Sequence, residues 1–157
     1  MSDAQTGHEK TLTALTAALA GTNLIYGLGM IESGVTFDFG QLVMDDEFAR
    51  MVKQVVGGIA VNDATLMVDE IAAVGSFGDF LSLDSTLRHM REQSQPALID
   101  RRVRDDWQER GASDLATRSL ERARTILETH HPEPLPEEVR ARVRAIVARA
   151  DEAARVG

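Results

Sequence analysis

The sequence predicts a mainly α-helical protein with at most one or two short strands. Apolar residues recur at three- and four-residue spacing along most of the 157-residue chain, which predicts about six or seven amphipathic helices. Glycines and prolines separate these helical segments. Residues 23–28 form the main strand-like run. Because a lone strand is not stable in water, this run needs a partner from another chain, or the isolated chain is all-helical.

The first helix is predicted over residues 3–20. Leucines at helical spacing form its apolar face, Ser2 or Asp3 can cap its start, and Gly21 can end it. Its alanines predict close packing against a neighbouring element. The strand candidate at 23–28 follows directly, as the short apolar run Asn-Leu-Ile-Tyr-Gly-Leu.

A glycine-rich loop follows the strand candidate. Gly27, Gly29 and Gly34 permit positive φ angles or a close approach of a ligand to the backbone, and Glu32 is the only carboxylate among them. The spacing lacks the dinucleotide-binding fingerprint. The loop is therefore either a tight turn between helices or a loop that carries site residues.

Two further helices are predicted in the first half of the chain. Asp38, with Gln41 three residues later in a capping-box arrangement, begins a helix that stops at Gly57. The acidic triplet 45–47 is assigned to its first turns, where the helix dipole favours negative charge, so the triplet requires no metal. Another helix is predicted from residue 62 to Gly75, where the glycine ends it.

The second half is predicted to be helical with short interruptions. Periodicity indicates helices over about 84–93, 98–110 and 113–130, the last capped by Ser113. A proline-rich linker ends at Pro136, which occupies the first position of the final helix.

Charge is distributed unevenly along the chain. The net charge is −8, with 3 basic and 12 acidic residues in 1–87 but 14 basic and 13 acidic residues in 88–157. An acidic surface repels phosphate, so we expect no nucleic-acid binding. The negative charge either favours a cationic small molecule or basic partner, or serves solubility alone.

Composition predicts a soluble globular protein. Hydrophobic residues make up 43% and charged residues 27% of the chain, and no apolar run approaches the roughly 20 residues of a membrane helix. The first residues do not resemble a signal peptide. Cysteine is absent, which excludes disulfides and thiolate metal sites and fits a cytoplasmic location.

Local patterns of reactive residues favour structural roles. His130 and His131 are adjacent and lack a third ligand at helical spacing, so we expect no metal site. Residues 100–102 together with Trp107 either form a charged clamp or, in the favoured interpretation, a salt-bridged helix surface around one buried anchor. No nucleophile elbow or Walker phosphate loop is present.

Several phrases, in order and spacing across about residues 3–110, resemble the trimethylamine methyltransferase family of corrinoid-dependent enzymes. These phrases are Asp3-Ala-Gln-Thr-Gly-His-Glu-Lys10, Leu19-Ala-Gly-Thr-Asn-Leu-Ile-Tyr-Gly-Leu-Gly-Met-Ile-Glu-Ser-Gly34, Gln41-Leu-Val-Met-Asp-Asp-Glu47, Gly57-Gly58-Ile59, Thr86-Leu-Arg-His-Met-Arg91, Pro96, Asp100-Arg101 and Trp107. The family includes methylamine and glycine betaine demethylating enzymes.

The resemblance implies a TIM barrel with a helical C-terminal extension, of which this chain is similar to the C-terminal third. Residues 1–75 are then the last barrel elements and residues 76–157 the helical extension. The implied reaction moves a methyl group from a tertiary or quaternary amine to a corrinoid on a separate protein, so this chain alone would bind no cofactor. Some members carry pyrrolysine, and no position like it falls within these residues.

The resemblance also implies a site on the loop after the barrel strand. Glu32 is the candidate catalytic residue. The candidate substrate-binding residues are Tyr26, Gly27, Gly29, Gln5 and Glu9. A carboxylate beside an aromatic ring suits a quaternary ammonium by charge and by cation–π attraction.

Two functions remain open at this point. The first is a methyltransferase fragment that is inactive alone, because a barrel that lacks most strands cannot shape its site. The alternative is a non-catalytic helical module for interaction or cation binding, derived from the same family. In both cases we expect a homo-oligomer, because a bare strand edge and a bare alanine-rich helix are unfavourable.

Overall fold

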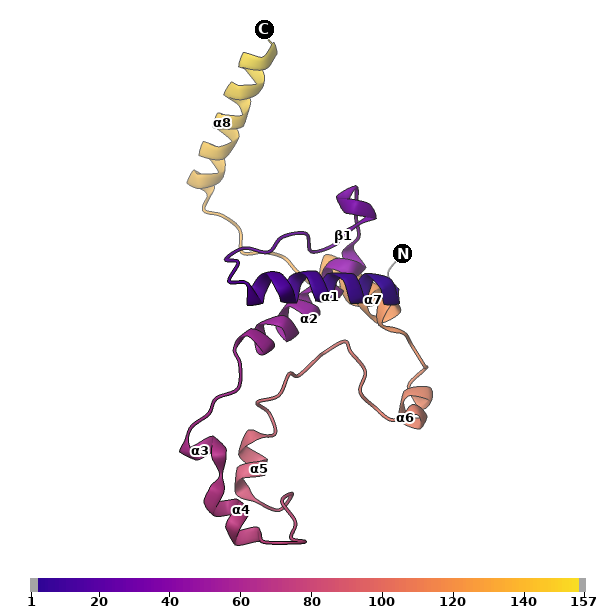
Figure 1. Cartoon of the computed structure of the whole chain (residues 1–157). Helices are drawn as coiled ribbons and strands as arrows, with labels where there is room; N and C mark the ends of the chain where they lie inside the picture. Colours follow the sequence, from indigo (N-terminus) through magenta and orange to yellow (C-terminus); the bar gives the residue numbers. More distant parts are fainter. Residues whose placement is uncertain (1–2, 156–157) are drawn as a thin grey trace. The chain divides into compact units, whose positions relative to one another are not determined.

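A computed structural model, described over residues 3–155, confirms the mainly α-helical fold (Figure 1). The helices and strands, in chain order, are α1 Ala4–Leu19, β1 Met30–Ile31, the 3₁₀ helix η1 Glu32–Gly34, β2 Thr36–Phe37, α2 Phe39–Val56, α3 Asp63–Leu66, α4 Val68–Val74, α5 Asp84–His89, α6 Arg104–Glu109, α7 Leu115–Thr129 and α8 Glu137–Arg155. None of the described helices combines the length and apolar character needed to cross a bilayer.

The chain divides into two compact units, residues 1–125 and 126–157. The first unit holds α1 to α6, the small sheet and most of α7, and the second holds the end of α7 and α8. This division reflects compactness only. The predicted division at residue 75, between barrel elements and helical extension, stays a prediction.

The predicted strand at residues 23–28 is wrong. No strand forms there, and Leu24 and Tyr26 are largely exposed. The two short strands lie later in the chain and pair antiparallel with each other, in the register Met30 with Phe37 and Ile31 with Thr36. Because residues 23–28 have no partner strand in the described chain, their backbone stays irregular.

The helices α1 and α2 begin where their caps predict. Asp38 accepts a hydrogen bond from the Gln41 backbone N–H at 2.6 Å, and Asp3 accepts one from the Thr6 N–H at 3.2 Å. The reciprocal half of the capping box at α2 is absent, because the Asp38 N–H donates to the Gly29 carbonyl at 2.8 Å, while the Gln41 amide donates to Asp45 at 2.6 Å.

Two predicted helices differ from the structure in the middle of the chain. The segment 62–75 divides into α3 and α4 at Met67, whose left-handed φ of 53° interrupts the helical hydrogen bonds. Helix 98–110 shortens to α6. The Glu47 carboxylate accepts hydrogen bonds from the backbone N–H groups of Leu98 and Ile99. These bonds hold the backbone around residues 98 and 99 in an irregular conformation.

The remaining helices start or end within a few residues of their predicted limits. Helix α5 ends at His89, short of the predicted residue 93. Asp114, not Ser113, caps α7, since its carboxylate accepts the Thr117 N–H at 2.7 Å. Helix α8 begins at Glu137, one residue after Pro136.

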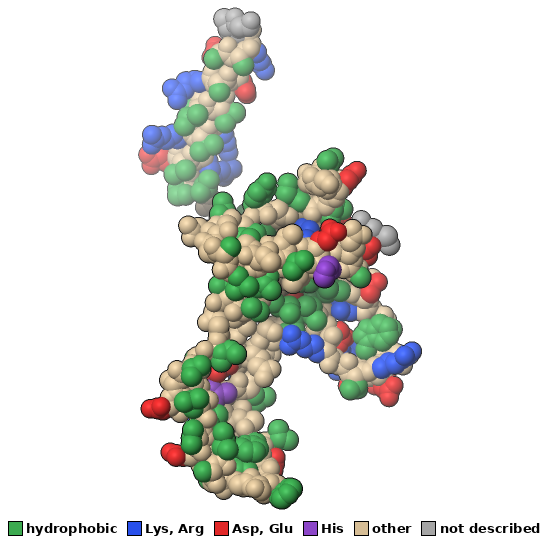
Figure 2. Space-filling view, viewed as in Figure 1, with side chains coloured by type: hydrophobic (Ala, Val, Ile, Leu, Met, Phe, Trp, Pro, Cys, Tyr) green, Lys and Arg blue, Asp and Glu red, His purple; other side chains and the backbone are tan. Residues whose placement is uncertain are grey.

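The core of the first unit is small and rich in polar side chains. Its buried hydrophobic residues are Met44, Val52 and Ala123, and its buried polar or charged residues are Gln41, Asp45, Glu47, Ser85 and Ser119. Many large apolar side chains stay exposed, and Figure 2 shows them in green over the visible face. Most of the buried side chains belong to α2, so this helix is the centre of the fold.

Candidate functional site

The glycine-rich loop is held between α1 and α2, which lie side by side (Figure 1). Lys10 on α1 and Asp45 on α2 form an ion pair with 2.6 Å between Nζ and Oδ2. The Lys10 side chain is 23% exposed and the Asp45 side chain 6%. Because the carboxylate is buried, the pair is screened much less by solvent than a surface pair.

Both partners of this ion pair also bind the loop backbone. The Lys10 ammonium donates to the Gly27 carbonyl at 3.1 Å, and the Asp45 carboxylate accepts the Gly29 N–H at 2.8 Å. The Gly29 carbonyl accepts the Asp38 N–H at 2.8 Å. The turn at residues 27–29 is therefore fixed at both ends by groups from outside it.

Gly29 can be only glycine without rearrangement of its neighbours. Its φ is +76°, and an added Cβ would lie 2.8 Å from a Phe37 ring carbon and 3.1 Å from the Leu42 Cβ. The buried backbone at this position approaches β2 and α2 closely.

Glu32, the candidate catalytic residue, begins the 3₁₀ helix that joins the two strands. It is exposed, and its φ of 53° places it in the left-handed region, as does the φ of 54° at Ser33. Its carboxylate accepts a hydrogen bond from the Thr36 hydroxyl at 2.5 Å. Non-glycine residues in this region are uncommon, and the catalytic role of Glu32 stays a prediction.

Of the other candidates, Tyr26, Gln5 and Glu9 are exposed, Gly27 is half-buried and Gly29 is buried. Tyr26 is 84% exposed, and no hydrogen bond or ring contact of its side chain is described in residues 3–155. Gln5 and Glu9 face each other on α1, where the Gln5 amide donates to the Glu9 carboxylate at 2.8 Å. Gly27 and Gly29 thus lie in one turn that Lys10 and Asp45 hold, whereas no described contact joins Tyr26 to Glu32. Their pairing stays a prediction.

Sequence reasoning missed Lys10, Asp45 and Gln41 as residues that organise the loop. The helix-dipole explanation of the acidic triplet 45–47 is wrong, because the triplet lies beyond the first turn of α2. Asp45 and Glu47 serve tertiary contacts, and Asp46 pairs with Arg50 on the surface. The triplet begins seven residues after the Asp38 cap, and this distance indicates from the sequence that its side chains do not interact with the helix N-terminus.

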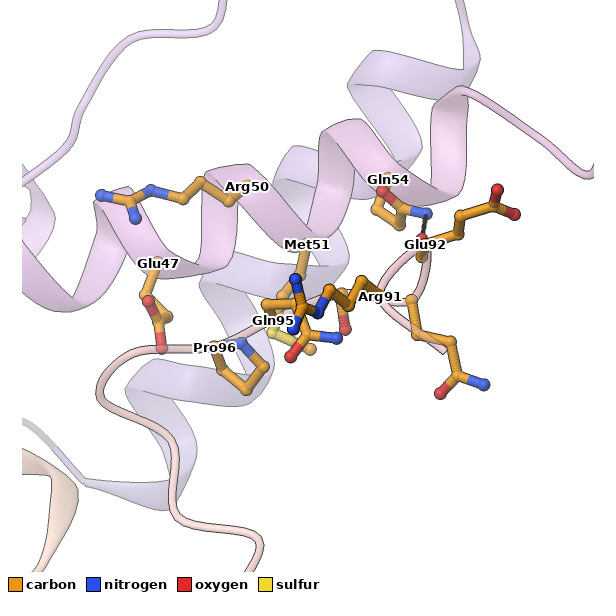
Figure 3. Close-up of a pocket in the computed structure, with 10 residues that line it drawn as sticks. Glu47, Arg50, Met51, Gln54, Arg91, Glu92, Gln95 and Pro96 are labelled. Carbon is orange, nitrogen blue, oxygen red and sulfur yellow. Dashed lines mark hydrogen bonds between the residues drawn. The ribbon is translucent and has the colours of Figure 1, made fainter. Parts of the chain in front are cut away.

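A second buried carboxylate, Glu47, anchors a different segment. It is 3% exposed and accepts the N–H groups of Leu98 and Ile99 at 2.7 and 3.1 Å. Beside it lies a hollow of about 270 Å³, lined by Glu47, Arg50, Met51, Gln54 and residues 91–96. Figure 3 shows Glu47 and Met51 of α2 pointing toward this segment, and the Gln54 amide donates to the Glu92 carbonyl at 2.9 Å.

Asp100 and Arg102 form a salt bridge, but they lie in the irregular chain before α6 and not on the predicted helix surface. Two guanidinium nitrogens of Arg102 bind the two Asp100 oxygens at 2.9 and 2.7 Å. These hydrogen bonds lower the pKa of Asp100 and raise the pKa of Arg102. Trp107 is half-buried, and its indole donates to the Ser113 carbonyl at 3.0 Å. A hollow of about 500 Å³ adjoins Asp100, Arg102, Arg104 and Trp107.

In residues 3–155, histidines and acidic residues form ion pairs and no cluster that could hold a metal ion. His89 pairs with Glu92, with 2.8 Å between Nδ1 and Oε1. Among the described residues, no cluster of three or more histidine, cysteine, aspartate or glutamate side chains has the geometry to hold an ion.

Comparison with known proteins identifies one family. The family model described as trimethylamine methyltransferase (MTTB) matches residues 1–154. Trimethylamine methyltransferase MttB of Desulfitobacterium hafniense is 55% identical over 145 residues, which cover 92% of this chain and 29% of that protein. Trimethylamine methyltransferase MttB2 of Methanosarcina mazei is 44% identical over 155 residues, 99% of this chain and 31% of that protein.

A relative with a different substrate in its name also matches. The glycine betaine methyltransferase of another Desulfitobacterium hafniense strain is 31% identical over 150 residues, which cover 93% of this chain and 31% of that protein. The chain therefore spans about a third or less of the length of these relatives.

Proposed function

Because this chain belongs to the trimethylamine methyltransferase family, we propose that it is the C-terminal part of a corrinoid-dependent methyltransferase. In the proposed reaction, a methyl group leaves the nitrogen of trimethylamine or a betaine-type amine. The acceptor is the cobalt of a corrinoid on a separate protein. The observation that carries the proposal is the 55% identity to a trimethylamine methyltransferase across 92% of this chain.

The glycine-rich loop supplies the residues for the amine in this proposal. Glu32 is the proposed catalytic residue, and its exposed carboxylate attracts a cationic amine by charge. The exposed ring of Tyr26 adds cation–π attraction, which favours methylated ammonium groups. Gly27 lets the substrate approach the backbone, the buried Gly29 shapes the turn that presents it, and Gln5 and Glu9 on α1 complete the proposed set.

We expect the isolated chain to be inactive. Tyr26 and Glu32 are open to water, whereas charge attraction and methyl transfer both gain from a site that excludes water. The rest of the methyltransferase would close the site. The same reasoning supports self-association of the isolated chain, since many large apolar side chains are exposed. A cytoplasmic location is part of the proposal, in line with the absence of cysteine.

A chimera tests the proposal directly. This chain would replace the matched region of the Desulfitobacterium hafniense trimethylamine methyltransferase, and methyl transfer from trimethylamine to the corrinoid protein would be measured. We expect transfer by the chimera, none by the 157-residue chain alone, and at least a tenfold loss in the Glu32→Gln chimera. A folded chimera that transfers no methyl group would overturn the proposal, as would robust transfer by the chain alone.

The alternative is a non-catalytic module that binds partners or cations. The exposed apolar side chains of the first unit favour it, because such surfaces mark interaction sites. Calorimetry with trimethylamine and glycine betaine distinguishes the two functions. Binding by the isolated chain together with an inactive chimera would support the module.

A further inference from the structure

We propose that Lys10, Asp45 and Gln41 form a positioning network that sets the conformation of the turn at residues 27–29. Through this turn, the network orients Tyr26 on one side and Glu32 on the other. This inference rests on the proposed function, since it gives the network its role at the amine site. None of the three residues is proposed to touch the substrate.

The network links three segments that are far apart in the chain. Lys10 lies 17 residues before Gly27, and Asp45 lies 16 residues after Gly29 and 35 after Lys10. One Asp45 oxygen receives both the Lys10 ammonium and the Gly29 N–H, and the other receives the Gln41 amide at 2.6 Å. Every polar contact described for Asp45 thus belongs to the loop or to groups that hold it.

The turn has little freedom while these contacts persist. Its entry is held at the Gly27 carbonyl, which accepts from both Lys10 and the Met30 N–H, at 3.1 Å each. At the end of the turn, the Gly29 N–H donates to Asp45 and the Gly29 carbonyl accepts from the Asp38 N–H. Phe37 and Leu42 fill the space beside the Gly29 Cα. Tyr26 directly precedes this turn and Glu32 follows it by three residues. The conformation of the turn therefore sets the positions of both candidate residues.

Gln41 shows that the arrangement carries a cost. The residue is fully buried, and its Oε1 has no hydrogen-bond partner among the described residues. Burying an unsatisfied acceptor and an ion pair is unfavourable compared with apolar side chains of similar size. Helix packing alone would be served better by such apolar residues. The presence of this network, although it is less stabilising than apolar packing, is consistent with a role in positioning the turn.

Hydrogen exchange on the 157-residue chain, followed by NMR for single amides, tests the anchoring. Lys10→Met should speed exchange of the Gly29 amide at least tenfold, because the turn loses the bond at the Gly27 carbonyl. Lys10→Arg should restore most of the protection, since it keeps the charge. The Leu98 amide, bound to Glu47, reports general destabilisation, and its exchange should speed up much less than that of Gly29.

A matched control uses the second buried carboxylate of α2. Glu47→Gln should speed exchange at Leu98 and Ile99 and leave Gly29 unchanged. Equal acceleration of Gly29 and Leu98 in Lys10→Met would overturn the proposal, because it would indicate loss of stability in general. Unchanged Gly29 exchange would overturn it as well.

The chimera described above supplies the functional readout. Lys10→Met should lower kcat/KM for trimethylamine about tenfold, and Lys10→Arg should recover it. Normal kcat/KM in Lys10→Met, despite faster Gly29 exchange, would overturn the positioning role. If the exchange results hold but the unmutated chimera transfers no methyl group, the proposed function fails and only the anchoring of the turn stands.

Discussion

The anchored region from α1 to α2 and the following region, residues 57–90, differ in what holds their loops. In the first region, a partly buried ion pair joins the loop to two helices. In the second, the described side-chain hydrogen bonds join residues at most six apart, such as the Thr86 hydroxyl to the Phe80 carbonyl at 2.6 Å. Ser85 is its buried side chain, and its hydroxyl lacks a partner among the described residues.

The difference indicates where stability is concentrated. Residues 57–90 expose ten large apolar side chains, which are Ile59, Val61, Leu66, Val68, Ile71, Phe77, Phe80, Leu81, Leu87 and Met90. Short-range bonds fix local turns but bury little apolar surface, so substitutions there should cost little. Substitutions in the anchored region should cost much more, because they leave buried charges or backbone groups unpaired.

The largest expected effect comes from Asp45→Ala. It leaves the Lys10 ammonium and the Gly29 N–H without their partner, and breaking a buried pair in this way costs about 3–5 kcal/mol. Urea unfolding followed by circular dichroism measures the loss. The matched control is Asp46→Ala, which removes an exposed pair with Arg50 and should cost roughly 0–1 kcal/mol. Equal losses in the two variants would contradict the comparison.

Gly29→Ala should have the second-largest effect. The free energy of unfolding should fall by about 2–4 kcal/mol, because of the positive φ and the overpacking against Phe37. Gly21→Ala provides the control, because its φ is also positive, at +83°, and no atom lies within 4 Å of the added Cβ. The control should lose only the conformational part, about 1–2 kcal/mol. Thermal unfolding of both variants distinguishes the steric cost at Gly29 from the cost of a positive φ.

Asp38→Ala removes the cap of α2 and should cost about 1 kcal/mol, because the Gln41 N–H loses its acceptor. Asn62→Ala removes the capping box of α3, a helix of four residues in the second region. We expect the Asn62 variant to lose helical signal locally without a shift of the main unfolding transition. A transition shifted as far as in Asp38→Ala would show that both regions unfold as one.

The smallest effect is expected at the exposed Asp100–Arg102 pair. Hydrogen bonds from Arg102 hold the pKa of Asp100 below its ordinary value of 3.8. The pair's stabilising contribution is therefore complete above pH 3.8 and is lost as the pH falls through the lowered pKa. Carboxyl NMR of Asp100 should show this pKa, and Arg102→Gln should move it back toward 3.8. An unchanged pKa would exclude Arg102 as the cause.

Helices with clear periodicity and caps could be predicted from the sequence. Helices α1, α2, α7 and α8 lie close to their predicted limits, because spaced apolar residues and local caps act within a few residues. Of the candidate site, the glycine-rich loop and Glu32 were found from glycine spacing and from the family resemblance. The roles of Tyr26, Glu32, Gln5 and Glu9 stay predictions, as does the homo-oligomer.

The errors arose where distant residues decide the local conformation. Residues 23–28 have the apolar pattern of a strand but no partner in the described chain. Residues 98–103 have a helical pattern, but their backbone is bound by Glu47 and by Arg118, whose guanidinium donates to the Leu98 carbonyl at 2.9 Å. Gln41 has the spacing of a capping box, but the Asp38 N–H that it would accept donates to the Gly29 carbonyl, and the Gln41 amide donates to Asp45.

The sequence by itself determined the helical class, the main helix limits and the family, because each depends on local propensity or on matching phrases. Only the tertiary structure decided that Asp45 serves the glycine-rich loop rather than the helix dipole. The physical reason is that a buried carboxylate needs specific donors. Gln41 is one helical turn away on α2, but the donors on Lys10 and Gly29 reach Asp45 only when α1 and the glycine-rich loop pack against α2.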